Sequence, residues 1–200
     1  MNGFVLTTGR SGSQSFVRAC RAMTNFTAAH ESRARRLGAD RLTYPDRHIE
    51  ADNRLSWMLG RLDRAYGREA RYVHLRRDPA KVAASYAQRW NPVGGIAPAY
   101  RDGILCAAPV SRLDAAADLV ETVEANLALF LRDKPHTMVF DLARAEEDFG
   151  RFWDWIGAEG DRAAALASWR TPHNAQKTRP RGTRRRERLF AAWRTLFPPP

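Results

Sequence analysis

The sequence predicts an α/β domain, a three-layer sandwich in which helices cover both faces of a central parallel sheet. Short apolar runs alternate with helical stretches along the chain, and this alternation is typical of parallel strands joined through helices. A glycine-rich turn separates the first apolar run from the helical stretch that follows it. With 200 residues, of which 44% are hydrophobic, the chain can bury one core, so a single domain over residues 1–200 is expected.

Short apolar stretches predict the strands of this sheet. The clearest is residues 71–76, where Tyr72, Val73 and Leu75 precede a pair of arginines. Because the ligands of parallel sheets bind outside the carboxyl ends of the strands, the turns at those ends are where a site is expected. The expected strands cover residues 3–8, 25–30, 48–51, 71–76 and 137–140.

The expected helices are marked by apolar residues on one face and by capping residues at their starts. Asp78 followed by Pro79 is a favoured helix start, because aspartate accepts backbone N–H bonds and proline fits the first turn. Ser111 with Asp114 three residues later resembles a capping box. The expected helices cover residues 13–24, 53–66, a segment that begins at 79, 111–131, 146–156 and 161–169.

Other segments show no clear period. Residues 32–41 are polar and basic and are expected to form an irregular or helical excursion. Residues 90–109 hold three prolines and three glycines and are expected to form a loop of a length usually reserved for function. From residue 171 the composition becomes strongly basic, with seven basic residues and one acid between Lys177 and Arg188.

The net charge of +11 indicates a polyanionic partner. Only three of the 33 basic residues are lysines, and the arginine fork suits bidentate binding of phosphate or sulfate. No apolar run approaches the roughly 18 residues that span a bilayer. The first strand begins too early to leave room for a secretory signal. A cytoplasmic protein without a membrane partner is therefore expected.

The cysteines and tryptophans are expected to be structural. Cys20 and Cys106 lie far apart, with no histidine or cysteine at metal-ligand spacing, so both are expected to be buried free thiols and no metal site is expected. Trp153, Trp155 and Trp169 fall at helical spacing, which favours a place in the core.

The first segment that carries chemistry is the turn over residues 7–15, with the sequence TTGRSGSQS. Glycines allow close backbone approach, serines add hydroxyl donors, and the arginine adds a fixed positive charge, so the turn suits an anionic phosphate. The lysine of the nucleotide-kinase motif G-x-x-x-x-G-K-[ST] is absent. An ordinary strand-to-helix turn is the alternative. The candidate binding residues are Arg10, Ser11, Gly12, Ser13, Gln14 and Ser15.

The second segment that carries chemistry is LRRDPAKVAASY, where a strand leads into a helix. Ser85 follows eight residues after Arg77, about two helical turns along, so an arginine and a hydroxyl can converge on a second phosphate. The alternative makes Arg77 a surface charge. Asp78 is expected to be only a cap.

Together, TTGRSGSQSF and LRRDPAKVAASY resemble the sulfotransferase family that uses 3′-phosphoadenosine 5′-phosphosulfate (PAPS). The resemblance extends loosely from residue 3 to about residue 142. It implies a P-loop-nucleotide-hydrolase-like fold, binding of the 5′-phosphosulfate by Arg10 and the turn after it, and binding of the 3′-phosphate by Arg77 and Ser85. It also implies that a basic C-terminal loop, here within residues 171–200, closes the donor site.

The family also has an acceptor-activating base near the end of its second strand, where this chain reads FTAAHES. Its members use a histidine or a glutamate here, so His30 and Glu31 are both candidates. Adjacent side chains on a strand diverge, so only one is expected to face the site. Glu31 is favoured, because comparable bacterial sequences carry a His-Glu pair here. Glu50, which closes another strand, could reach the same pocket.

The resemblance implies metal-independent, in-line transfer of a sulfuryl group from PAPS to a hydroxyl or amine, with 3′,5′-ADP as the product. Arg10 would stabilise developing charge. The acceptor is left open between small molecules and carbohydrates, among others, and the oligomeric state is also left open. The alternatives are a P-loop kinase that uses ATP and magnesium, and a non-catalytic nucleotide- or RNA-binding protein. No recognised nucleic-acid-binding motif supports the last of these.

Overall fold

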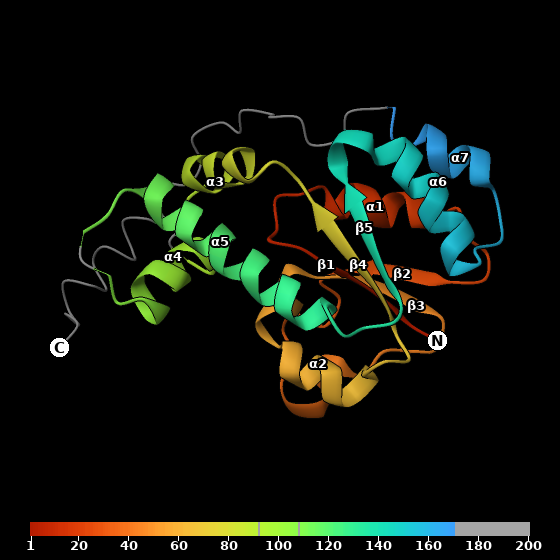
Figure 1. Cartoon of the computed structure of the whole chain (residues 1–200), viewed down its shortest axis with the longest axis horizontal. Helices are drawn as coiled ribbons and strands as arrows, with labels where there is room; N and C mark the ends of the chain where they lie inside the picture. The colour runs from red at the N-terminus through yellow and green to blue at the C-terminus, as the bar shows by residue number, and fades with distance from the viewer. Residues whose placement is uncertain (92, 108, 171–200) are drawn as a thin grey trace.

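Five parallel strands form one sheet in the computed structural model, which describes residues 1–91, 93–107 and 109–170 (Figure 1). The strand order is β2-β3-β1-β4-β5, so β1 lies at the centre. This α/β architecture confirms the predicted class. The strands are β1 (Gly3–Leu6), β2 (Thr27–His30), β3 (His48–Ala51), β4 (Arg71–Arg76) and β5 (Thr137–Asp141).

Helices cover both faces of the sheet and complete a three-layer sandwich. One face packs against α1 (Ser13–Cys20), α6 (Ala145–Ile156) and α7 (Arg162–Ala167). The other face packs against α2 (Leu59–Tyr66), α3 (Pro79–Gln88), α4 (Ile96–Ala99) and α5 (Arg112–Leu131). Among the described residues, no helix has the length and apolar character that crossing a membrane requires.

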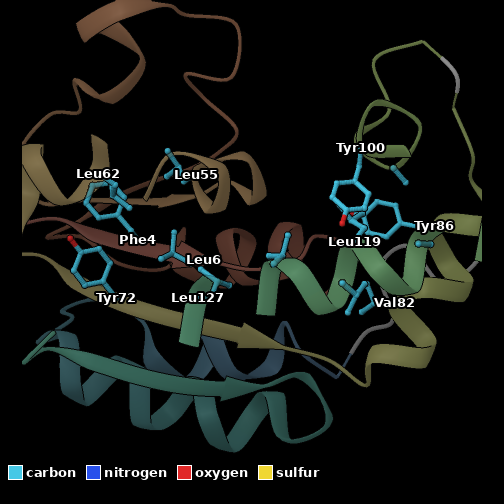
Figure 2. Close-up of a cluster of buried hydrophobic side chains, with 14 of the residues drawn as sticks. Phe4, Leu6, Leu55, Leu62, Tyr72, Val82, Tyr86, Tyr100, Leu119 and Leu127 are labelled. Carbon is cyan, nitrogen blue, oxygen red and sulfur yellow. The ribbon is translucent and has the colours of Figure 1, made fainter. Parts of the chain in front are cut away.

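Alternation along the central strands builds the two cores. Phe4, Leu6 and Tyr72 point to the face covered by α2 and α5, where Figure 2 shows them close to Leu62 and Leu127. Their neighbours along β1 and β4, such as Val5 and Val73, point to the opposite face, toward α1 and α6. Both faces of β1 and β4 are therefore buried, as a doubly covered parallel sheet requires.

Several boundaries differ from the predicted ones. The segment over 53–66 is not one helix, because a 3₁₀ helix (Asn53–Trp57) precedes α2, and Asp52 caps that 3₁₀ helix by accepting from the Arg54 N–H. The segment over 90–109 is not a plain loop. It contains α4 and a π-helical turn (Tyr100–Ile104). Ala97 and Tyr100, one helical turn apart, are buried against α5, and this packing was not visible as a period in the sequence.

The expectations for cysteine and tryptophan hold in part. Cys20 is a buried free thiol whose pKa is raised by burial, whereas Cys106 is exposed, against the expectation, and has a positive φ of 49°. Trp153 is buried in the core, as predicted. Trp155 is only half-buried, and Arg71 lies over its ring. The predicted role of the basic segment 171–200 lies outside the described residues.

The carboxyl ends of β1 and β4 create the place for a site. The chain leaves β1 toward α1 on one face of the sheet, and it leaves neighbouring β4 toward α3 on the other face. Connections that diverge in this way open a crevice at the sheet edge, where ligands of open α/β sheets bind. The two predicted phosphate-binding segments meet at this crevice.

Candidate functional site

The turn between β1 and α1 is held in an unusual backbone conformation. Three of its residues have positive φ: Gly9 (82°), Arg10 (58°) and Gly12 (90°). The Tyr86 hydroxyl on α3 donates to the Thr8 carbonyl over 2.7 Å and fixes the turn from the side. A non-glycine residue with positive φ is uncommon, and such strain often marks a functional site.

The serines of the turn divide into two groups. Ser11 is fully buried, and its hydroxyl donates to the Gly9 carbonyl over 3.0 Å, so this side chain shapes the turn instead of facing a ligand. Ser13, Gln14 and Ser15 form the first turn of α1 and line a cleft. With Gly12 as the N-cap and no side-chain cap bond, the helix presents its first N–H groups at the mouth of that cleft.

The cleft has a volume of about 1090 Å³, which is large enough for a nucleotide-sized ligand. It lies at the carboxyl ends of the strands, between the β1–α1 turn, α3 and the start of α6. The predicted site residues Arg10, Gly12, Ser13, Gln14, Ser15, His30, Glu31, Arg77 and Ser85 all line it.

Arg77 and Ser85 both line the cleft, and each makes a hydrogen bond with Arg10, a contact that their spacing did not predict. Arg77 Nη1 donates to the Arg10 carbonyl over 2.8 Å, and Arg10 Nε donates to Ser85 Oγ over 3.2 Å. The Arg77 guanidinium therefore lies at the backbone of the β1–α1 turn, and the Arg10 guanidinium lies at Ser85 on α3. Arginine and hydroxyl donors at this density suit a second phosphate. Asp78 accepts from the Lys81 N–H and is a cap, as predicted.

The α3 face that lines the cleft carries further basic residues. Lys81 and Arg89 lie one helical turn on either side of Ser85, and all three line the cleft. Lys81 and Arg89 were not among the predicted site residues, although their spacing of four residues from Ser85 is visible in the sequence. Among the described residues that line the cleft, one side chain is a carboxylate, that of Glu31, and His30 lies beside it in the sequence. Five lining side chains are positively charged at neutral pH: Arg10, Arg54, Arg77, Lys81 and Arg89. This lining favours an anionic ligand.

His30 and Glu31 both face the cleft, so the expectation that only one would do so was wrong. The strand β2 ends at His30, and Glu31 has a φ of 51°, so the alternation of an extended chain stops between them. His30 Nε2 lies 2.9 Å from Ser13 Oγ. Glu31 forms an ion pair with Arg54 over 2.7 Å.

Two acids, Glu50 on β3 and Asp52 just after it, are buried and do not line the cleft. Glu50 is fully buried and bonded to Ser32, so the expectation that it could reach the pocket was wrong. Asp52 is also buried and forms an ion pair with Arg41 over 2.5 Å, while its other oxygen caps the Arg54 N–H. Burial raises the pKa of the Asp52 carboxyl, and the Arg41 guanidinium opposes that rise.

An apolar wall completes the other side of the cleft. Leu142, Ala145 and Trp169 line it next to Ser15. Trp169 packs edge-on against Phe16 in the core, so the expected core role holds only for part of its surface. Its indole N–H is buried and has no acceptor among the described residues. This wall can receive a flat apolar group such as a nucleobase.

Gly9→Ala is expected to destabilise the domain by roughly 2–4 kcal/mol, since strain at positive φ costs about 1–3 kcal/mol and a clash adds to it. A Cβ atom at Gly9 would collide with the Tyr86 hydroxyl and lie 2.7 Å from Asn53 Nδ2. Denaturant unfolding measures the change. Gly38→Ala is the matched control, because Gly38 also has positive φ (56°) but has no atom within 4 Å of the added carbon. Equal losses in the two variants would show that the contact with Tyr86 contributes nothing.

Comparison with known proteins assigns no family: no family model matches the chain, and no curated protein matches its sequence.

Proposed function

We propose that this protein is a PAPS-dependent sulfotransferase and that the cleft binds PAPS across two anion sites. The first site is Arg10 with the N-terminus of α1, which would hold the 5′-phosphosulfate. The second is Arg77 with Ser85, which would hold the 3′-phosphate. The direct contacts of Arg10 with both Arg77 and Ser85 are the observation that carries the proposal, because they join the two sites in one cleft.

The reaction follows from the side chains at the β2 end of the cleft. PAPS supplies an activated sulfuryl group, and the acceptor supplies an oxygen or nitrogen that loses a proton. In this proposal Glu31 takes that proton, and His30, held by Ser13, orients the acceptor. Arg10 and the N–H groups at the start of α1 stabilise the charge that develops on the leaving 5′-phosphate. Arg77 and Ser85 act at a distance by fixing the donor.

The acceptor would enter between Glu31 and the segment before α4. Gly94 and Gly95 from this segment line the cleft together with Ile96 and Pro98 from α4, so this part of residues 90–109 would form the acceptor wall. The wall combines two glycines with apolar side chains. A small molecule or a carbohydrate with a free hydroxyl is the class of acceptor that we propose.

Ligand-induced thermal stabilisation separates the proposal from its alternatives. The sulfotransferase proposal expects 3′,5′-ADP to stabilise the protein more than ADP or ATP, with or without magnesium. A magnesium-dependent preference for ATP would instead identify a kinase. Salt-dependent binding of RNA without preference for the 3′-phosphate would identify a nucleic-acid-binding protein.

Arg77→Ala is expected to weaken binding of 3′,5′-ADP by roughly 10- to 150-fold, the worth of a charged hydrogen bond of about 1.5–3 kcal/mol, and to leave ADP binding nearly unchanged. Calorimetric titration with both nucleotides measures the two affinities. Arg76→Ala is the matched control, because Arg76 is the preceding residue but lines a separate groove beside α5. If the Arg77 variant still distinguishes 3′,5′-ADP from ADP as the wild type does, the assignment of Arg77 is wrong.

A further inference from the structure

Glu50 is a fully buried carboxylate whose two oxygens are directed at one neighbouring residue. Oε1 accepts from the Ser32 backbone N–H over 2.7 Å, and Oε2 accepts from the Ser32 hydroxyl over 2.6 Å. Burying a charge is costly unless it is fully hydrogen-bonded, so these bonds are strong constraints on the chain. Ser32 directly follows Glu31, the carboxylate that faces the cleft.

The position of Glu31 depends on what holds the chain on either side of it. Its own N–H donates to the Ala51 carbonyl over 3.1 Å, which is the last bond that continues the pairing of β2 with β3. Beyond that bond the backbone turns to a φ of 51° at Glu31, a conformation that glutamate rarely adopts. The two bonds from Ser32 to Glu50 fix the chain immediately after this turn.

The carboxylate of Glu50 is itself held from behind. His48 Nε2 lies 3.1 Å from Glu50 Oε2, and His48 Nδ1 lies 2.8 Å from Thr27 Oγ1 at the start of β2. The Tyr44 ring stacks on the His48 ring, with centroids 5.5 Å apart. Through Glu50 and His48, these contacts connect Ser32, which follows β2, with Thr27, the first residue of β2.

We infer that Glu50 is a positioning residue: by clamping the backbone and hydroxyl of Ser32, it holds Glu31 in the left-handed conformation that directs its carboxylate into the cleft. Glu50 reaches the reacting atoms only through Glu31. The inference rests on the proposed function for its chemical consequence, while the clamp itself is a property of the fold.

Two variants break the clamp to different degrees. Glu50→Met keeps most of the side-chain volume and removes both acceptors. Ser32→Ala removes one bond at an exposed residue, so it preserves the fold. Glu50→Gln is the conservative variant, because its amide still accepts from the Ser32 N–H and can donate to the Ser32 hydroxyl oxygen. Glu124→Met is the matched control, since Glu124 is an acid that pairs with His74 away from the cleft.

Hydrolysis of PAPS by water is the reaction that needs no identified acceptor. The bond from sulfur to the 5′-phosphate oxygen breaks, with its electron pair leaving on 3′,5′-ADP, while a bond forms from sulfur to water and the water proton passes to Glu31. Exchange of a sulfuryl group from 4-nitrophenyl sulfate to 3′,5′-ADP is the companion reaction. Its leaving group departs as a stable phenolate, so the exchange does not require Glu31 to move a proton.

Glu50→Met is expected to lower kcat of PAPS hydrolysis by at least about 10-fold, a part of what a well-placed base contributes. Ser32→Ala is expected to cause a smaller loss, and Glu50→Gln is expected to stay within about threefold of wild type. Affinity for 3′,5′-ADP and the exchange rate are expected to stay unchanged in all of them. A Glu50→Met variant that keeps the hydrolysis rate overturns the inference. So does one that loses binding, exchange and hydrolysis in parallel, because that pattern describes a general structural defect.

Hydrogen exchange at the Ser32 amide tests the clamp without the proposed reaction. The wild type is expected to protect this amide, and Glu50→Met is expected to accelerate its exchange by at least about 10-fold, whereas Glu124→Met leaves it unchanged. A protein that does not bind 3′,5′-ADP, but loses this protection in Glu50→Met, contradicts the proposed function and supports the clamp. Exchange at Ser32 that is as fast in the wild type as in Glu50→Met overturns the clamp, whatever the protein binds.

Discussion

Glu31→Gln is expected to lower kcat of PAPS hydrolysis by about 10²–10⁴-fold, the usual contribution of a general base. The amide cannot accept the proton, yet it keeps the size of the side chain and an oxygen for Arg54, which lies 2.7 Å from the carboxylate in the wild type. Affinity for 3′,5′-ADP is expected to be equal or higher, because the substitution removes a negative charge from a cleft that is otherwise lined by basic side chains. Release of inorganic sulfate measures the rate, and calorimetry measures the affinity.

His30→Gln is the matched control and also decides between the two candidate bases. If Glu31 is the base, the histidine variant is expected to lose far less activity, since glutamine can still hydrogen-bond to Ser13. The opposite ranking would assign the base to His30 and leave Glu31 as the partner of Arg54. If both variants hydrolyse PAPS as fast as the wild type, neither His30 nor Glu31 acts as a general base.

The parts of the site that the sequence predicted are those set by local spacing. The glycines and serines of residues 7–15 indicated a phosphate-binding turn. The separation of eight residues placed the Ser85 hydroxyl about two helical turns after Arg77, which follows β4. Both segments follow strands, so a parallel sheet brings them to one edge. The two segments do share that edge, where Arg77 and Ser85 each contact Arg10.

The parts that were missed depend on tertiary contacts. Alternation predicted that His30 and Glu31 would diverge, but alternation holds only while a strand lasts, and β2 ends at His30. Arg54 was not selected, because its approach to Glu31 joins two segments that are not neighbours in the sequence. Glu50 was expected to be able to reach the pocket because it closes a strand, and only the fold shows that Ser32 donates to both of its oxygens.

Arg41 shows the same limit for stability. It lies at the end of the polar, basic segment (residues 32–41) that was expected to be an irregular or helical excursion, yet it is only 1% exposed. Its guanidinium is bonded to Asp52 over 2.5 Å and to the Tyr44 hydroxyl over 3.3 Å. No local pattern distinguishes it from the exposed arginines before it, because its burial depends on tertiary contacts of the 3₁₀ turn (Gly38–Leu42), such as the one with Asp52 just after β3.

Arg41→Met is expected to destabilise the domain by about 3–5 kcal/mol at neutral pH, the cost of leaving one charge of a buried pair without its partner. Methionine fills much of the volume, so the loss measures mainly the uncompensated Asp52 carboxylate. Burial already raises the pKa of Asp52, and loss of Arg41 raises it further. A raised pKa means that Asp52 binds its proton more tightly in the folded state than in the unfolded state. The loss of stability is therefore largest above the folded-state pKa of Asp52, and it decreases as the pH falls through that pKa toward the pKa of the unfolded chain. Urea unfolding at neutral and at acidic pH measures both effects.

The double variant Arg41→Met with Asp52→Leu separates charge from packing. Replacing both members of a buried pair by apolar residues is often neutral, so most of the lost stability should return, less the cap that Asp52 gives to the Arg54 N–H. Arg101→Met is the surface control, because Arg101 pairs with the exposed Asp102, and such a pair contributes at most about 1 kcal/mol. A loss at Arg41 no larger than at Arg101, or one that does not decrease at acidic pH, would show that Asp52 is not left as an unpaired buried charge. In that case the position of Arg54, whose N–H is capped by Asp52 and whose side chain pairs with Glu31, would not depend on the Arg41–Asp52 ion pair.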